Sequence, residues 1–201
     1  MLALIDEARH FPEAVVEHRQ ELRRLAVDQR PQALFISCAD SRVQPLSITG
    51  ARPGQVLELR TAGNIVPAHR PDAVCAVGAT LEYALEELTV PEIVVWGHSH
   101  CGTVRGLIYQ DTVRMMPMVK RWLDQAADET PLPRLPVPPG TSALSARAQQ
   151  HLLLQLGHLR TYPVVARRLA SGAVGLHAWF YRVETGETLA WQSDSGTFRP
   201  L

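Results

Sequence analysis

Three short apolar runs that alternate with helical stretches constrain the fold of this 201-residue chain more than any other feature. The runs cover residues 33–37 (ALFIS), 55–60 (QVLELR) and 93–96 (IVVW). Their length and composition are typical of parallel strands that are buried on both faces. Strands that alternate with helices form right-handed β-α-β units around a parallel sheet. The sequence therefore predicts an α/β fold with a mostly parallel central sheet flanked by helices.

Several helices are predicted around this sheet. Apolar side chains recur at helical spacing over residues 74–88, Asp72 stands where an N-cap is expected, and Pro91 blocks continuation. Residues 12–26 predict an amphipathic N-terminal helix, with Pro12 in its first turn. Further helices are predicted from about Thr103, around Leu152, Leu156 and Leu159, and over residues 161–169 up to Gly172.

The C-terminal part of the chain predicts a change of strand direction. Residues 174–183 and 188–191 have strand character and are joined across Thr185-Gly186-Glu187, which is typical of a hairpin. We therefore expect an antiparallel strand at the C-terminal edge of the sheet.

Charge and cysteine content narrow the class of protein. The 20 Lys and Arg residues balance the 20 Asp and Glu residues, so no basic surface for nucleic acid or anionic membrane is predicted. No apolar run approaches the roughly 18 residues that span a bilayer, and residues 1–9 lack the pattern of a secretory signal. Three cysteines are too few for a disulfide scaffold and indicate a reducing compartment. We expect a cytoplasmic enzyme that binds neither nucleic acid nor membrane.

Metal-ligand side chains follow the first and third apolar runs, in residues 38–42 (CADSR) and 97–102 (GHSHCG). Ligands of open parallel sheets bind at the carboxyl ends of neighbouring strands. If these two strands are adjacent, Cys38, His98 and Cys101 meet at one place. Two thiolates and an imidazole suit zinc in tetrahedral geometry. The sequence therefore predicts one Zn²⁺ ion per chain.

The sequence does not decide which group occupies the fourth coordination position. Three protein ligands leave room for water, which marks a catalytic zinc site. Asp40 either fills this place or accepts a hydrogen bond from the water while Arg42 holds its carboxylate. A closed structural zinc, with His100 or Asp40 as fourth ligand, is one alternative. Absence of any metal is another, because a Cys at a strand end is more often a small buried hydrophobe.

The other cysteine and histidines show no ligand spacing. Cys75 falls within the predicted long helix and is assigned to core packing, and His100 to a solvated loop. The histidines assigned to ordinary core or surface roles are His10, His18, His69, His151, His158 and His177.

The chain divides into segments within one domain, since domains usually run to roughly 100–200 residues. We expect a single domain over residues 1–201. Its parts are an N-terminal helical arm (1–28), a zinc-site core (29–130), a loop with five prolines (131–140), and C-terminal helices and strands (141–201).

These motifs resemble those of the β-class carbonic anhydrases. The resemblance rests on residues 38–42 and 97–102, which stand at the family's usual interval, and extends through 52–54 (RPG), 60–64 (RTAGN) and 82–84 (EYA). It covers nearly the whole chain. It implies an α/β enzyme that catalyses the zinc-dependent, reversible hydration of CO2 to bicarbonate and a proton.

The resemblance also implies the roles of residues at the reacting centre. Cys38, His98 and Cys101 match the family's zinc ligands. Zinc hydroxide is then the nucleophile, and the pair Asp40 and Arg42 orients it.

Substrate-binding residues follow from the same resemblance. Gln29 and Tyr83 match the plant-like subgroup, and the backbone N–H of Gly102 matches a donor to substrate. Leu57 stands on the apolar wall, where the subgroup usually has Phe. Phe35 stands where members with a regulatory bicarbonate site tend to have Trp, so bicarbonate inhibition of that kind is not expected.

Two other functions remain open, because chemistry resides in a site and not in a fold. One is a hydrolase of a CO2-like substrate such as carbonyl sulfide or carbon disulfide, and the other is a non-catalytic protein with a closed structural zinc. The resemblance implies a homodimer or a dimer of dimers in which the N-terminal helix packs on a neighbouring subunit.

Overall fold

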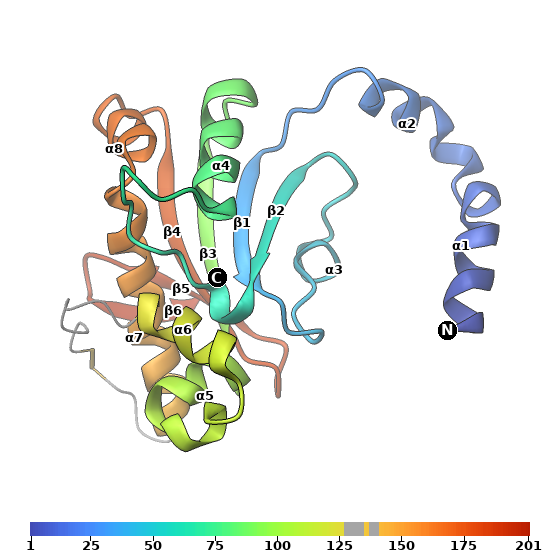
Figure 1. Cartoon of the computed structure of the whole chain (residues 1–201). Coiled ribbons are helices and arrows are strands. Elements are labelled where there is room, and N and C mark those ends of the chain that lie inside the picture. The colour runs from blue at the N-terminus through green and yellow to red at the C-terminus, as the bar shows by residue number, and fades with distance from the viewer. Residues whose placement is uncertain (127–134, 137–140) are drawn as a thin grey trace. The chain divides into compact units, whose positions relative to one another are not determined.

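The computed structural model describes residues 1–126, 135–136 and 141–201 (Figure 1). These residues form two compact units, Met1–Arg30 and Pro31–Leu201. The smaller unit consists of helices, and the larger unit carries the sheet. Most of the predicted Pro-rich loop over 131–140 lies outside the described residues.

A six-stranded sheet with the order β2-β1-β3-β4-β5-β6 forms the centre of the larger unit. Its strands are β1 (Ala33–Cys38), β2 (Val56–Thr61), β3 (Glu92–His98), β4 (Gly175–Tyr181), β5 (Thr188–Gln192) and β6 (Thr197–Pro200). The pairs β1–β2, β1–β3 and β3–β4 are parallel, whereas β4–β5 and β5–β6 are antiparallel. The predicted fold class is confirmed. The edge holds two antiparallel strands and not one, because the short β6, with Arg199 and Pro200, shows no apolar run.

Helix α4 (Ala76–Glu82) begins later than the sequence predicts. Cys75, and not Asp72, is the N-cap residue, and its Sγ accepts a hydrogen bond of 3.3 Å from the backbone N–H of Gly78. Val74 therefore lies outside the helix and is fully exposed. Cys75 is half-buried against the core as expected, but it caps the helix and does not lie within it.

The helix continues into a π-helical turn, η3 (Tyr83–Glu87). The N–H of Leu88 donates to the carbonyl oxygen of Tyr83, five residues earlier. The turn leaves Tyr83 47% exposed, while Ala84 and Leu85 next to it are buried.

The remaining helices of the larger unit flank the sheet. They are α3 (Pro45–Thr49), α5 (Gly102–Ile108), α6 (Pro117–Ala126), α7 (Ala143–Arg160) and α8 (Pro163–Ala170), with short turns η2 (Ala62–Asn64) and η4 (Gln110–Val113). Helices α7 and α8 confirm the two helices predicted before the last strands. None of the described helices is long and apolar enough to cross a bilayer.

The main core lies between one face of the sheet and the helices α4, α7 and α8 (Figure 1). Leu34 of β1, Leu81 of α4 and Leu152 of α7 are all 0% exposed in this core. The opposite face of the sheet buries Phe35 and Trp96, whose rings meet edge to face at 5.3 Å. Strands β1 and β3 are thus buried on both faces, which explains their uninterrupted apolar runs.

The smaller unit contains α1 (Leu2–Ala14), η1 (Val16–His18) and α2 (Arg19–Leu25). The prediction of one helix over residues 12–26 is wrong, since Pro12 lies inside α1 and the chain leaves the helix after Ala14. A proline removes a helical hydrogen bond, which favours a break near this position. None of the residues in these three elements is buried.

Candidate metal centre

Cys38, His98 and Cys101 converge at the carboxyl ends of two adjacent strands. Cys38 ends β1, His98 ends β3, and Cys101 is the N-cap residue of α5. The Sγ atoms of Cys38 and Cys101 are 3.9 Å apart, and the three potential ligand atoms lie within 4.8 Å of one another. All three residues are buried, with at most 4% of their surface exposed. The predicted convergence of these side chains is therefore present in the fold.

The geometry of the cluster fits a tetrahedral zinc ion. Zinc–sulfur bonds of about 2.3 Å place two sulfur ligands about 3.8 Å apart, close to the distance of 3.9 Å in this structure. The Nδ1 atom of His98 is 2.8 Å from the carbonyl oxygen of Ser99, which fixes the proton on Nδ1. The Nε2 atom is buried without a hydrogen-bond partner among the described residues. A buried nitrogen lone pair beside two sulfurs is the arrangement that a metal ion satisfies.

The pKa values of the two cysteine thiols are shifted in opposite directions. The pKa of Cys38 is lowered, chiefly because the Cys101 S–H donates to its sulfur, with a further hydrogen bond from the backbone N–H of Gly63. The same hydrogen bond and burial raise the pKa of Cys101. A divalent cation at the centre would remove this competition by stabilising both thiolates.

Asp40 and Arg42 form a bidentate ion pair beside the cluster. The Nε and Nη2 atoms of Arg42 donate to the two carboxylate oxygens of Asp40 at 2.9 and 2.8 Å. These bonds hold the pKa of Asp40 well below its usual range. One oxygen of Asp40 lies 3.9 Å from Nε2 of His98. An ionised carboxylate is therefore fixed within reach of a group bound at the cluster.

Arg60 holds the backbone that carries Cys38 and Asp40. Its guanidinium donates to the carbonyl oxygens of Cys38 at 3.0 Å, Asp40 at 2.8 Å and Val43 at 2.6 Å. The sequence assigns no role to Arg60 beyond its place in the RTAGN motif, because carbonyl partners twenty residues away leave no trace in a pattern of side chains.

Polar side chains of α7 bind the irregular backbone that follows β2. The Nε2 atom of His151 lies 2.9 Å from the Gly63 carbonyl oxygen, and Nδ1 of His158 lies 2.6 Å from that of Val66. The Val66 N–H donates to Oε1 of Gln155 at 2.8 Å. Burial lowers the pKa of His151 to about 4, so its ring is neutral near physiological pH. These histidines are core residues, as expected, and they stabilise the segment whose Gly63 N–H donates to Cys38.

The predicted substrate-binding residues belong to different elements of the structure. Gly102 begins α5 directly after Cys101, and a side chain there would meet nothing within 4 Å. Leu57 pairs with Leu34, four residues before Cys38, which is roughly 13 Å along the strand at about 3.3 Å per residue. Gln29 is exposed and belongs to the smaller unit.

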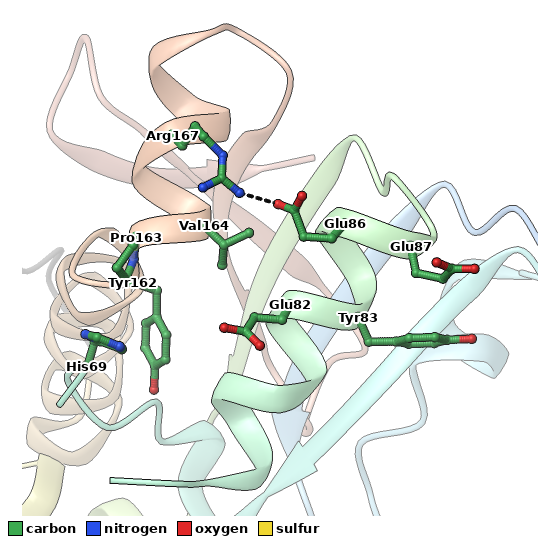
Figure 2. Close-up of a pocket in the computed structure, with 9 residues that line it drawn as sticks. All are labelled: His69, Glu82, Tyr83, Glu86, Glu87, Tyr162, Pro163, Val164 and Arg167. Atoms are coloured by element: carbon green, nitrogen blue, oxygen red, sulfur yellow. Dashed lines mark hydrogen bonds and ion pairs between the residues drawn. The ribbon is translucent and has the colours of Figure 1, made fainter. Parts of the chain in front are cut away.

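Tyr83 lies on the π-helical turn at the rim of a separate cavity. This cavity of about 450 Å³ between the α4–η3 helix and α8 also contains the ion pair of Arg167 and Glu86, at 2.6 Å. Figure 2 shows the ring of Tyr83 pointing away from Tyr162 and from the ion pair. No ligand of the metal cluster lines this cavity. Within the larger unit, the structure thus brings Cys38, His98 and Cys101 together with the ion pair of Asp40 and Arg42, whereas Leu57 and Tyr83 lie elsewhere in that unit.

Comparisons with known proteins agree with this geometry. A family model described as carbonic anhydrase matches residues 33–188. A carbonic anhydrase of Synechocystis sp. is 37% identical over 195 residues, covering 95% of this chain and 71% of that protein. A carbonic anhydrase of Pseudomonas aeruginosa is 37% identical over 203 residues, covering 100% of this chain and 92% of that protein.

Solved structures show the same fold. The β-carbonic anhydrase CcaA superimposes with a TM-score of 0.88 and 35% identity, covering 100% of this chain and 99% of that chain. One of two tetrameric β-carbonic anhydrases from Sordaria macrospora superimposes with a TM-score of 0.70 and 22% identity, over 94% of each chain.

Proposed function

The chain belongs to the β-carbonic anhydrase family, whose general reaction is the hydration of CO2, and from this premise we propose that it interconverts CO2 and bicarbonate at a zinc ion held by Cys38, His98 and Cys101. The observation that carries the proposal is the buried cluster itself. Three ligand atoms lie within 4.8 Å of one another, and an ionised carboxylate lies beside them. Zinc, when bound, supplies a Lewis acid that lets water act as a nucleophile near neutral pH.

Asp40 and Arg42 orient the nucleophile in this proposal. The carboxylate of Asp40 accepts a hydrogen bond from the water and turns a lone pair toward CO2. Arg42 keeps Asp40 ionised through two hydrogen bonds and donates a third, of 3.1 Å, to the carbonyl oxygen of His100. The same carboxylate, one oxygen of which lies 3.9 Å from Nε2 of His98, could instead serve as the fourth ligand of a bound metal ion.

Substrate oxygens are bound by donors at the edge of the cluster. The backbone N–H of Gly102 lies in the first turn of α5, where it has no partner within the helix. Gln29, Leu57 and Tyr83 are proposed to line the site from a neighbouring subunit. Leu57 pairs with Leu34, four residues before Cys38, and no candidate metal ligand lines the cavity beside Tyr83.

A homodimer or a dimer of dimers is the proposed assembly. Helix α1 buries none of its residues and exposes Leu4 at 72% and Phe11 at 56%, which share one face of the helix. Apolar helix faces of this kind are stabilised by burial against another surface. The Sordaria macrospora enzymes with the same fold are tetrameric.

The proposed site of action is the cytoplasm. All three cysteines are free, and the two in the cluster must stay reduced to bind zinc. A reducing compartment meets this need.

A zinc assay and a CO2 hydration assay on the same sample test the function. X-ray fluorescence should give about one zinc ion per chain, and stopped-flow indicator measurements should detect hydration at alkaline pH. Cys101→Ala should lose both the metal and the activity. Full zinc occupancy without hydration above background at alkaline pH would contradict the proposal. Hydrolysis of carbonyl sulfide or carbon disulfide by the same zinc-loaded sample would then identify a hydrolase.

A further inference from the structure

The turn that joins His98 to Cys101 is hydrogen-bonded to the end of β4 and to the loop between β4 and β5. Ser99, at 0% exposure, donates its N–H to the Tyr181 carbonyl oxygen at 2.8 Å. Its hydroxyl accepts from the Val183 N–H at 2.9 Å and donates to Oε2 of Glu184 at 2.5 Å. Every one of these partners lies on a segment more than eighty residues away in the chain.

The same turn contains a strained residue. His100 has a φ of +56°, a left-handed conformation that a residue with a Cβ adopts at a cost. Its Nε2 lies 3.4 Å from Oε2 of Glu184, and its carbonyl oxygen accepts from Arg42. Strained backbone persists only where surrounding contacts determine it. Glu184 contacts both residues that separate His98 from Cys101.

The hairpin does not need Glu184 for its own closure. Arg182 and Glu187 form an ion pair of 2.5 Å across the turn, and the Arg182 N–H donates to the Glu187 carbonyl oxygen at 2.8 Å. The carboxylate of Glu184 is directed instead at Ser99. The hydroxyl of Ser99 lowers the pKa of Glu184, so the bond is made to a charged acceptor, which is the stronger kind.

We propose that Glu184 is a positioning residue that fixes the Ser99–His100 link so that His98 and Cys101 reach the same metal ion. The proposal rests on the proposed metal binding of the cluster. Glu184 touches neither ligand, and it acts through the backbone between them. Partners of this indirect kind typically change metal affinity by about 10- to 100-fold when removed.

Zinc affinity, measured by competition with a chromophoric chelator, tests the proposal. Glu184→Ala should bind zinc about tenfold more weakly than the natural protein. Glu184→Gln should lose less, because its amide oxygen still accepts from the Ser99 hydroxyl. The double variant Ser99→Ala with Glu184→Ala should lose less than the sum of the two single losses, because both substitutions remove the Ser99–Glu184 hydrogen bond.

Glu187→Ala is the matched control. It removes a carboxylate from the same hairpin but leaves the Ser99 contacts intact, so zinc affinity should stay unchanged. Equal losses in Glu184→Ala and Glu187→Ala would overturn the proposal and indicate general weakening of the hairpin. Unchanged affinity in Glu184→Ala would overturn it as well.

A spectrum of the cobalt-substituted protein gives a second readout. The visible bands of Co²⁺ report ligand geometry, so Glu184→Ala should shift them while Glu187→Ala should not. A natural protein that binds metal but hydrates no CO2 would refute the proposed function alone, since the affinity ratios still decide the role of Glu184. A natural protein that binds no metal would refute both.

Discussion

Two Asp-x-Arg pairs with the same spacing lie in different regions of the molecule. Asp28 and Arg30, at the end of the smaller unit, form an ion pair of 2.9 Å with exposed fractions of 60% and 87%. Asp40 and Arg42 form a pair of 2.8 Å with exposed fractions of 17% and 46%. Water screens the first pair, so it contributes little, whereas the second lies beside a buried cluster. The same residues at the same spacing thus differ in exposure and surroundings because of where the fold places them.

The two units also differ in the burial of their side chains. The metal cluster lies among side chains with almost no exposed surface, whereas the helices of the smaller unit contain no buried residue. The centre is built within one chain. In the proposed assembly, a neighbouring subunit buries the exposed apolar side chains of the smaller unit.

The largest expected difference is in core packing. Leu152→Ala should lower the free energy of unfolding by about 2–5 kcal/mol, because Leu152 is 0% exposed in the main core. Leu4→Ala, at 72% exposure, should change it by less than about 0.5 kcal/mol in the monomer. Urea unfolding monitored by circular dichroism measures both. A large loss in Leu4→Ala at low protein concentration would show that the smaller unit has a core of its own.

Lowering the pH should reduce the free energy of unfolding of the larger unit through its buried histidine, His151. Burial lowers the pKa of His151 from 6.5 to about 4, so between these values the unfolded chain binds a proton that the folded chain excludes. Its contribution is complete above pH 6.5 and is lost as the pH falls toward 4, on the order of 3 kcal/mol in all. His151→Gln should flatten the dependence of unfolding on pH in this window.

The two Asp-x-Arg pairs give a direct kinetic comparison. Asp40→Asn should lower kcat/KM by about 10- to 100-fold while zinc stays bound, because the oriented acceptor beside the cluster is lost. Asp28→Asn should leave kcat/KM unchanged. Stopped-flow hydration assays and zinc content measure the effect. Loss of stability without loss of rate in Asp40→Asn would instead indicate a structural zinc site.

Deletion of residues 1–28 should have the smallest effect on the metal centre itself. Zinc content per chain should stay near one, because every ligand lies in the larger unit. The assembly should become smaller in light scattering as the exposed apolar faces are removed. A deletion variant that keeps its oligomeric size would refute the proposed packing of the arm on a neighbour.

The strands and the convergence of Cys38, His98 and Cys101 were predictable because both follow from short-range patterns. Apolar runs ending at Cys38 and His98 predict strands, and parallel pairing then places their ends together. Arg60 and Glu184 were not predictable in the same way, since Arg60 binds backbone oxygens and Glu184 contacts a residue more than eighty positions away. The N-cap at Cys75 was missed because a thiol rarely takes the role of a carboxylate or hydroxyl.

The hydrogen bonds from Arg60 to three backbone carbonyl oxygens affect which substitutions the loop after β1 can tolerate. Carbonyl groups are present whatever side chain a residue carries. Replacing the side chain of Ala39 or Ser41, which lie between these positions, should therefore leave the hydrogen bonds of Arg60 intact. Substitutions in this loop that have little effect beside Arg60 should therefore become more harmful when Arg60 is replaced, because three of the hydrogen bonds that hold the loop backbone are then lost.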